Sequence, residues 1–163
     1  MYPPFQSVTD IQAQAAVLRD RTYGVIETAN DCFVAVHLRP FPKWGSLLEC
    51  WWDERMKRHR AGNRCWLYYN QPWGLRNFLA LMYVASYKDT TLATFHGALV
   101  VLDEIAKLKK TDALVTDVTN PRISDRLLKR NGWEQHCLES PGRRFIKRFY
   151  GKYPTSLTTM QVR

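Results

Sequence analysis

Histidine and glutamate side chains are the groups of this chain best suited to acid–base chemistry. An imidazole, or a glutamate removed from water, can accept a proton from an amine near neutral pH. His96 is our candidate for a catalytic base, and His37, His136, Glu27 and Glu134 are further candidates. For each of them the alternative is an ordinary surface side chain or one with a satisfied hydrogen bond. No HExxH spacing and no paired Cys and His ligands occur, so the sequence predicts no metal site.

The segment 86–99 (SYKDTTLATFHGAL) contains residues that could bind phosphate groups. Lys88 offers a positive charge, and Thr90, Thr91 and Thr94 offer hydroxyls where a helix is expected to begin. A helix N-terminus carries a partial positive charge of about half a unit, which attracts anions. The alternative is that these threonines only cap the helix.

Apolar periodicity and turn residues divide the chain into the elements that must position these groups. Helices are predicted over residues 7–20, 46–59, 91–109 and 121–131. Strands are predicted over residues 22–28, 32–38, 64–70, 77–86 and 113–118, with turns at Asn30-Asp31 and, in a final antiparallel hairpin, at Ser140-Pro141-Gly142.

The strand 77–86 is the most hydrophobic segment, which predicts a central strand buried on both faces. With the helix 91–109 it predicts a right-handed crossover to a parallel strand at 113–118. On that helix, Leu92 is expected to begin the apolar face, and Asp103 and Lys107 are expected to pair at i,i+4.

The last helix has clear start and stop signals. Asn120 suits the N-cap and Pro121 the first helical position. Gly132 suits the left-handed residue beyond the end, which allows Trp133 to fold back on Leu128.

These features together resemble the GNAT superfamily of acyl-CoA N-acyltransferases. The order strand, helix, strand, helix, strand, strand from Asn77 onward resembles the second half of that fold. In the last helix, this chain resembles the family's sequence pattern at Asn120, Ser124, Leu127, Arg130 and Gly132-Trp133. The resemblance covers about half of the chain, and the preceding segments are compatible with the first half. It implies an α+β fold of the α/β three-layer type, in which a mixed, mostly antiparallel sheet is flanked by helices. The central parallel strands 78–86 and 113–118 would splay apart to admit acyl-CoA.

The resemblance also implies an activity and a set of site residues. The activity is N-acyl transfer from acetyl-CoA or another acyl-CoA to an unidentified amine. His96 would be the catalytic residue, at the cofactor end of the crossover helix. The implied cofactor-binding residues are Val84, Ala85, Ser86, Lys88, Thr94, Gly97, Asn120 and Arg122. For Asn120 a purely structural cap is the alternative.

Two departures from the family pattern concern the chemistry. Many members carry a tyrosine four residues before the glycine of the last helix, as general acid to the departing thiolate, and this chain has Leu128 there. The family's glycine-rich pyrophosphate loop is represented at most by Gly97. A non-catalytic GNAT-fold binding protein therefore stays as an alternative.

The net charge of +9 favours polyanionic partners, although a solvated basic surface would have the same composition. Residues 107–152 hold twelve Lys and Arg against five Asp and Glu. A second cluster consists of Arg55, Lys57, Arg58, Arg60 and Arg64. The segment RRFIKRFYGKY alternates basic and aromatic residues, so nucleic-acid binding is a further hypothesis that we do not favour.

The length of 163 residues and the apolar content of 45% predict one globular domain, residues 1–153, with a flexible tail at 154–163. No apolar run approaches the roughly 18 residues of a membrane span, and no leader pattern begins the chain, so we expect a cytoplasmic protein that does not engage a membrane. The four cysteines, none in a CxxC pair, are expected to be reduced core residues.

Overall fold

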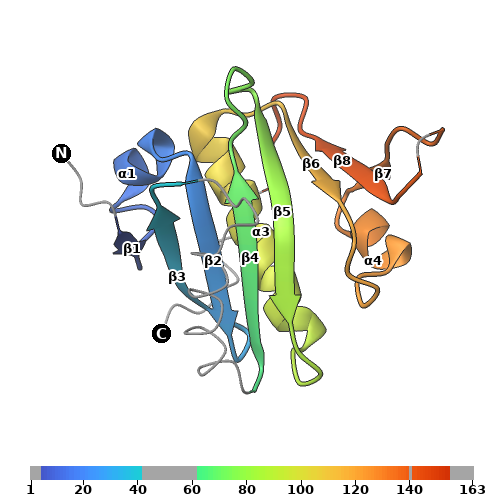
Figure 1. Cartoon of the computed structure of the whole chain (residues 1–163). Helices are drawn as coiled ribbons and strands as arrows, with labels where there is room; N and C mark the ends of the chain where they lie inside the picture. The colour runs from blue at the N-terminus through green and yellow to red at the C-terminus, as the bar shows by residue number, and fades with distance from the viewer. Residues whose placement is uncertain (1–4, 42–61, 140, 155–163) are drawn as a thin grey trace.

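A single mixed sheet forms the centre of the fold in the computed structural model, which describes residues 5–41, 62–139 and 141–154 (Figure 1). The strand order is β1-β3-β2-β4-β5-β6-β8-β7. The elements are β1 (Gln6–Val8), α1 (Ala15–Asp20), β2 (Tyr23–Ala29), β3 (Cys32–Arg39), β4 (Arg64–Asn70), β5 (Phe78–Ser86), α3 (Leu92–Lys109), β6 (Ala113–Asp117), α4 (Asp125–Arg130), β7 (Glu134–Gln135) and β8 (Arg144–Arg148). The predicted fold class, a mostly antiparallel mixed sheet flanked by helices, is confirmed.

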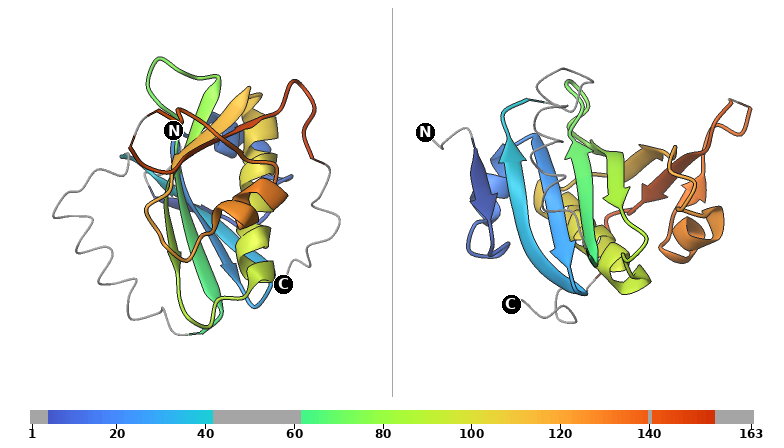
Figure 2. Two further views of the ribbon diagram at one scale, coloured as in Figure 1. Left: turned by 90° about the vertical axis from the view of Figure 1, so that its right-hand side faces the viewer. Right: turned by 60° about the horizontal axis from the view of Figure 1, so that its bottom comes forward.

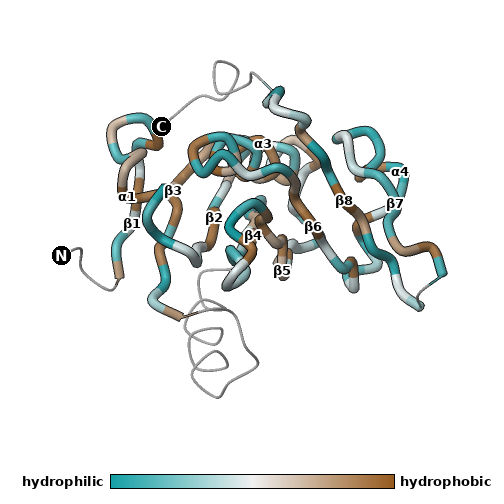
Figure 3. Tube along the Cα trace, turned by 90° about the horizontal axis from the view of Figure 1, so that it is seen from above, coloured by the Kyte–Doolittle hydropathy of each residue, from teal (hydrophilic) through white to brown (hydrophobic). Residues whose placement is uncertain are grey.

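The described helices all lie on one side of the sheet (Figures 2 and 3). The long helix α3 connects β5 to the parallel strand β6, as the crossover prediction required, and packs across the central strands. The buried core between them contains Phe95, Leu99, Leu102 and Ile105 of α3 with Leu67, Tyr69, Leu79 and Leu114 of the sheet. Burial of this apolar surface between α3 and the sheet stabilises the fold.

The parallel strands β5 and β6 pair over only four residues and then separate. Their register runs from Phe78↔Ala113 to Leu81↔Thr116. Beyond this point β5 continues beside β4 as far as Ser86, while the end of β6 pairs with β8 at Asp117↔Arg144. The predicted splaying of the parallel pair is therefore confirmed. The expectation that β5 is buried on both faces is wrong beyond the separation, where Met82 and Tyr83 are 45% and 42% exposed.

The crossover helix begins as predicted, but its charged pairs differ from those expected. Thr91 is the N-cap, and its hydroxyl accepts a hydrogen bond from the Thr94 amide. Asp103 pairs with Lys147 of β8 at 2.7 Å instead of with Lys107, because both side chains are buried in the same interface. Leu92 is 69% exposed, since the helix has not yet reached the sheet at its first residue.

The predicted N-terminal helix is wrong over its first half. Gln6–Val8 forms β1, which pairs with β3, and the helix begins only at Ala15. The Asp10 side chain caps the turn that leads into this helix, since its carboxylate accepts a hydrogen bond from the amide of Ala13 at 2.9 Å. The open edge of β3 takes the preceding residues into the sheet, and Val8 becomes fully buried.

The last helix ends as predicted and begins later than predicted. The amide of Trp133 donates to the Leu128 carbonyl at 3.1 Å, and Gly132 has φ +85°, so the left-handed stop is confirmed. The N-cap, however, is Ser124, whose hydroxyl accepts from the Leu127 amide at 3.1 Å. Asn120 instead organises a turn before the helix.

Several further expectations can be compared with the structure. The turn at Asn30-Asp31 is confirmed, with φ of 51° and 64°. Cys65 is buried and Cys32 half-buried, but Cys137 is exposed, because it follows the short strand β7 in a left-handed conformation. The helix predicted at 46–59, Cys50, the basic residues 55–60, Ser140 and the tail from residue 155 lie outside the described residues. Within the described ranges no helix is both long and apolar enough to span a bilayer, and no cluster of metal-ligating side chains occurs.

Candidate active site at the split between β5 and β6

Two side chains cross the split where the β5–β6 ladder ends. The Thr116 hydroxyl donates to the carbonyl of Leu81 at 2.9 Å, at the last paired position. Further along, the side-chain NH2 of Asn120 donates to the backbone carbonyl of Val84 at 3.4 Å, which is long for a hydrogen bond. Side chains thus replace the backbone ladder at these two carbonyls, and the edge of β5 faces a gap instead of a strand.

A narrow inner cleft lies in the split: the space that a water molecule can occupy in it is about 20 Å³, and the total rises to about 370 Å³ only when space open to solvent is counted. Its lining residues are Leu81, Met82, Tyr83, Val84, Phe95, Thr116, Asp117, Val118, Thr119, Asn120, Ile123 and Leu128. Most of this wall is apolar, which suits an extended uncharged arm. Of these residues, Tyr83 and Asp117 carry titratable side chains.

An outer hollow adjoins the inner cleft, because Phe95 and Ile123 line both. It measures about 660 Å³, again including open space, and its lining residues are Ser86, Tyr87, Lys88, Thr90, Thr91, Leu92, Phe95, Arg122, Ile123 and Leu127. Lys88 and Arg122 supply two positive charges. Among the described residues neither forms an ion pair, so both charges are available to an anion at the mouth.

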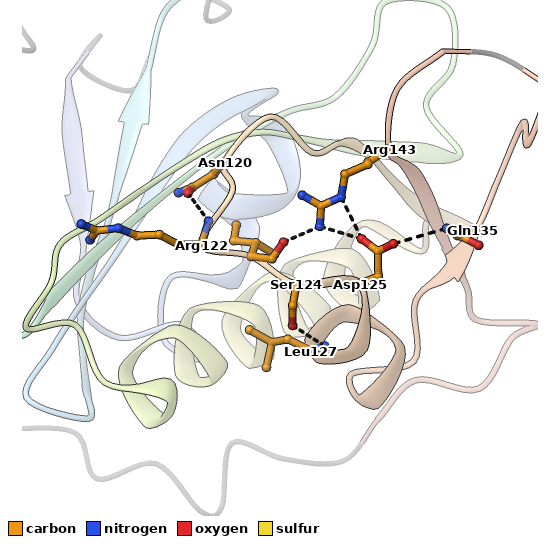
Figure 4. Close-up of polar contacts among 8 residues, drawn as sticks. Asn120, Arg122, Ser124, Asp125, Leu127, Gln135 and Arg143 are labelled. Carbon is orange, nitrogen blue, oxygen red and sulfur yellow. Dashed lines mark hydrogen bonds and ion pairs between the residues drawn. The ribbon is translucent and has the colours of Figure 1, made fainter.

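Arg143 holds the loop that carries Asn120 and Arg122 (Figure 4). Its guanidinium donates to the Asp125 carboxylate, with Nε–Oδ1 at 2.8 Å, and also to the carbonyl of Ile123. The Asn120 carboxamide oxygen accepts the amide of Arg122 at 3.0 Å, which forms an Asx turn. The Arg122 side chain extends away from this cluster (Figure 4). The loop is therefore fixed from β8 and α4, and Asn120 is held against the split.

The N-terminus of α3 is covered by polar groups from neighbouring turns. The Asp31 carboxylate accepts the Thr91 hydroxyl at 2.5 Å and the Thr94 hydroxyl at 2.9 Å. The Asp31 amide donates to the Thr94 hydroxyl, and the side chain of Asn63 accepts the Thr91 amide, each at 2.9 Å. Hydrogen bonds from Thr91 and then Thr94 hold the pKa of Asp31 below its ordinary value. A negative charge of the chain itself thus lies where the helix dipole attracts anions.

The structure brings five of the predicted site residues to the split and its mouth: Val84, Ser86, Lys88, Asn120 and Arg122. Ala85 belongs instead to the small cluster with Val25, Trp66 and Tyr68. Alternate residues of a strand point to opposite faces of the sheet, so the side chain of Ala85 points to the face opposite that of Val84.

Three predicted residues of α3 do not line either the cleft or the hollow. Thr94 is fully buried, with its hydroxyl bonded to Asp31, and Gly97 is also buried. His96 is exposed, and its Nδ1 lies 2.6 Å from the Asn131 carboxamide oxygen. Their roles in binding or catalysis stay predictions.

Two of the further candidate bases, His37 and Glu27, lie in a polar chain on neighbouring strands. The His37 Nε2 is 2.7 Å from the Glu27 carboxylate, and its Nδ1 is 2.8 Å from the Ser7 hydroxyl. Glu27 also accepts from Arg64 at 3.1 Å. None of these residues lines the split, and their bonds are satisfied among themselves.

Five residues of the site escaped the sequence analysis: Asp31, Tyr83, Thr116, Asp117 and Arg143. Thr116 and Asp117 had a visible signal, because they are the two polar residues of the strand ALVTD. Asp31 was identified only as part of a turn, and its contact with α3 depends on residues about 60 positions away. Arg143 had no local signal.

The residues of the split fit one part of an acyl-CoA better than the other. The open edge of β5 and the apolar walls match the chemistry of an extended pantetheine arm, but the inner cleft has room for about one water molecule, so β5 and β6 would have to separate further to admit the arm. A pyrophosphate at the start of α3 does not fit, because the Asp31 carboxylate and the Asn63 carboxamide already engage the capping groups there. Leu128 lines the cleft at the position of the family tyrosine and has no proton to donate.

The basic hairpin does not offer the aromatic faces that base stacking requires. Phe145 and Phe149 are 1% and 4% exposed and belong to the core, so these two rings offer no stacking face, and nucleic-acid binding stays an untested hypothesis. Tyr150 is exposed at the end of the strand.

No protein-family model and no curated protein matches this chain. Among solved structures, the crystal structure of nourseothricin acetyltransferase aligns with a TM-score of 0.34 and 14% sequence identity, over 90% of this chain and 99% of that one.

Proposed function

We propose that the protein transfers an acyl group from a CoA-type thioester to an amine, with the split between β5 and β6 as the site of transfer. The observation that supports this proposal most is the end of the β5–β6 ladder after Leu81 and Thr116, with a cleft in the opening. The resemblance of the last helix to the GNAT pattern agrees with it.

In this proposal the chain's residues bind and orient the donor. The edge of β5 around Val84 offers backbone groups to an amide-containing arm, and Asn120 exchanges its weak bond to the Val84 carbonyl for one to the ligand. The walls formed by Phe95, Ile123 and Leu128 keep water from the arm. A bound thioester would supply the acyl group and a thiolate leaving group.

Proton transfer would fall to the two titratable side chains of the inner cleft. The Asp117 carboxylate, which is 60% exposed and lies 3.9 Å from the Arg144 guanidinium, would accept a hydrogen bond from the attacking amine and take its proton as the new bond forms. The Tyr83 hydroxyl can donate one to the departing sulfur. We assign these roles because both residues line the cleft, whereas His96 does not. The Tyr83 ring lies 6.0 Å from that of Tyr68, on the face of the sheet that carries Ala85, so its hydroxyl would reach the sulfur from that face.

Residue-resolved titration tests the proposal directly. Amide NMR with acetyl-CoA is expected to shift residues 82–86 and 116–123, and ATP at equal ionic strength is expected to leave residues 82–84 unchanged. The variant Asn120→Ala should weaken binding, and Asn77→Ala is the matched control because Asn77 bonds Asp112 away from the cleft. Absence of shifts at both strands would contradict the proposal.

Leu128 and Asp31 also favour a second candidate, a protein that binds such a ligand without catalysis. Leu128 cannot donate a proton, and Asp31 covers the start of α3. The two candidates differ in turnover. Transfer of acetyl from acetyl-CoA to any of a panel of amines, abolished by Asp117→Asn with binding retained, would establish the enzyme. Binding without transfer across the panel would favour the second candidate.

A further inference from the structure

We propose that this site recognises its donor through the acyl-phosphopantetheine arm and a single phosphate, and does not bind the nucleotide pyrophosphate. This inference rests on the proposed function and names its donor class. The class is acyl thioesters of phosphopantetheine, presented either by CoA with its nucleotide in solvent or by an acidic carrier protein.

The first step of the argument is the position of Asp31. Its carboxylate receives hydroxyl bonds of 2.5 Å from Thr91 and 2.9 Å from Thr94, and its own amide bonds Thr94. These contacts bring the β2–β3 turn against the first turn of α3. The carboxylate cannot swing aside for a ligand without the loss of its bonds from Thr91, Thr94 and the Asn63 carboxamide.

The second step concerns the donors at that helix end. The Thr91 amide donates to Asn63 and the Thr94 amide donates to the Thr91 hydroxyl. A pyrophosphate at this place would therefore lack two of the amides that a phosphate site uses, and would lie beside a carboxylate of the same sign.

The third step is the charge at the outer hollow. Lys88 and Arg122 line it together with Ser86 and Thr90. Two cations suit one phosphodiester, whereas a CoA nucleotide carries a pyrophosphate and a further phosphate. The adjoining Leu92, Phe95, Ile123 and Leu127 form an apolar wall, which suits the gem-dimethyl group that stands next to the phosphate in phosphopantetheine.

The exposed surface of α4 bears on the source of the arm. Arg126, Lys129 and Arg130 are exposed on this helix, and Leu127 of the same helix lines the hollow. An acidic carrier that delivers its arm into the hollow would meet these cations, whereas a free nucleotide does not require them.

Calorimetry with three probes tests the inference: acetyl-CoA, S-acetyl-phosphopantetheine and S-acetylpantetheine. We expect the first two to bind within about threefold of each other, and the probe without phosphate to bind about tenfold more weakly. Lys88→Gln with Arg122→Gln should remove the advantage of the phosphate and leave S-acetylpantetheine binding unchanged.

Asp31→Asn provides an independent readout, because it removes the charge and keeps the side-chain size. It should strengthen acetyl-CoA binding by about tenfold and leave S-acetyl-phosphopantetheine within about twofold. Asp89→Asn is the matched control, since it removes an equal charge from the loop before α3, and Asp89 does not line the hollow. If Asp31→Asn fails to fold, the three-probe comparison on the wild-type chain still decides.

The outcomes separate this inference from the proposed function. Acetyl-CoA binding about a hundredfold tighter than S-acetyl-phosphopantetheine would overturn the inference and leave the proposed function standing. Absence of binding for all three probes would overturn both. Finally, rates with an acetylated carrier protein and with acetyl-CoA, and competition by the carrier without its arm, distinguish the two sources.

Discussion

Thr116 donates its side-chain hydroxyl to the backbone carbonyl of Leu81 at 2.9 Å, at the last residue pair before β5 and β6 separate. A side chain therefore ends the parallel ladder at the point where the cleft begins. A valine there would keep the shape and remove the donor.

The variant Thr116→Val should lower the free energy of unfolding by about 1 kcal/mol, because a partly buried carbonyl loses its partner. Urea denaturation measures the change. Thr119→Val is the control: Thr119 lines the same cleft but is exposed, so its replacement should change stability by less than about 0.5 kcal/mol. Equal effects of the two variants would contradict the role of the Thr116 hydroxyl.

Ser124 rather than Asn120 caps α4, so the two positions should respond differently. Ser124→Ala removes the acceptor of the Leu127 amide and should cost about 1 kcal/mol of stability, with faster hydrogen exchange at Leu127. Asn120→Ala should leave exchange at Leu127 unchanged and affect the Arg122 amide instead. Faster exchange at Leu127 in the Asn120 variant would restore the sequence-based assignment of the cap.

The Asp31 contacts predict a specific dependence of stability on pH. Hydrogen bonds from Thr91 and Thr94 lower the pKa of Asp31 in the folded state below the ordinary value of 3.8. The stabilisation is therefore fully present above the ordinary pKa and is lost as the pH falls through the lower folded value. The free energy of unfolding of wild type should fall with acid in this range by more than that of Asp31→Asn. Parallel profiles for the two proteins would show that the carboxylate contributes no acid-linked stability.

The ion pair of Asp103 and Lys147 is buried, so removal of one partner should be costly. Burial raises the pKa of Asp103, and Lys147 opposes this shift. Lys147→Met leaves an unpaired carboxyl in the core and should lower the free energy of unfolding by about 3 kcal/mol. The double variant Asp103→Leu/Lys147→Met should recover most of this loss in thermal or urea denaturation. A double variant as unstable as the single one would mean that packing, and not the orphaned charge, is responsible.

The elements predicted correctly from the sequence are those whose signals are local. The stop of α4 needs only Gly132 and the contact of Trp133 with Leu128, and both lie within a few residues. The start of α3 likewise depends on Thr91 and Thr94. The crossover from β5 to β6 follows from the handedness of strand–helix–strand units, so their parallel pairing was also predictable.

The errors arise where distant residues compete with a local signal. Ser7 and Val8 pair with β3 although a helix was predicted from residue 7, because an open strand edge offers backbone partners. Asp103 pairs with Lys147, 44 residues away, and not with its helical neighbour.

Five of the residues that the resemblance implied lie at the split and its mouth, although their role in binding stays a prediction: Val84, Ser86, Lys88, Asn120 and Arg122. The contact of Asp31 with the N-terminus of α3 could not be predicted. It requires the turn between β2 and β3 to pack against residues that follow 63 positions later in the sequence. The direction of the His96 side chain also depends on where α4 ends.

The insertion of β8 between β6 and β7 affects how the protein is made. Strand β6 keeps four residue pairs with β5, and its remaining neighbour is β8, which is translated some thirty residues later. During synthesis β6 therefore emerges from the ribosome with an unpaired edge. The side of the cleft that β6 forms stays without its β8 neighbour until residues 143–149 have left the exit tunnel. A nascent chain that stalls before that point would expose the edge of β6 to chaperones or to other copies of itself.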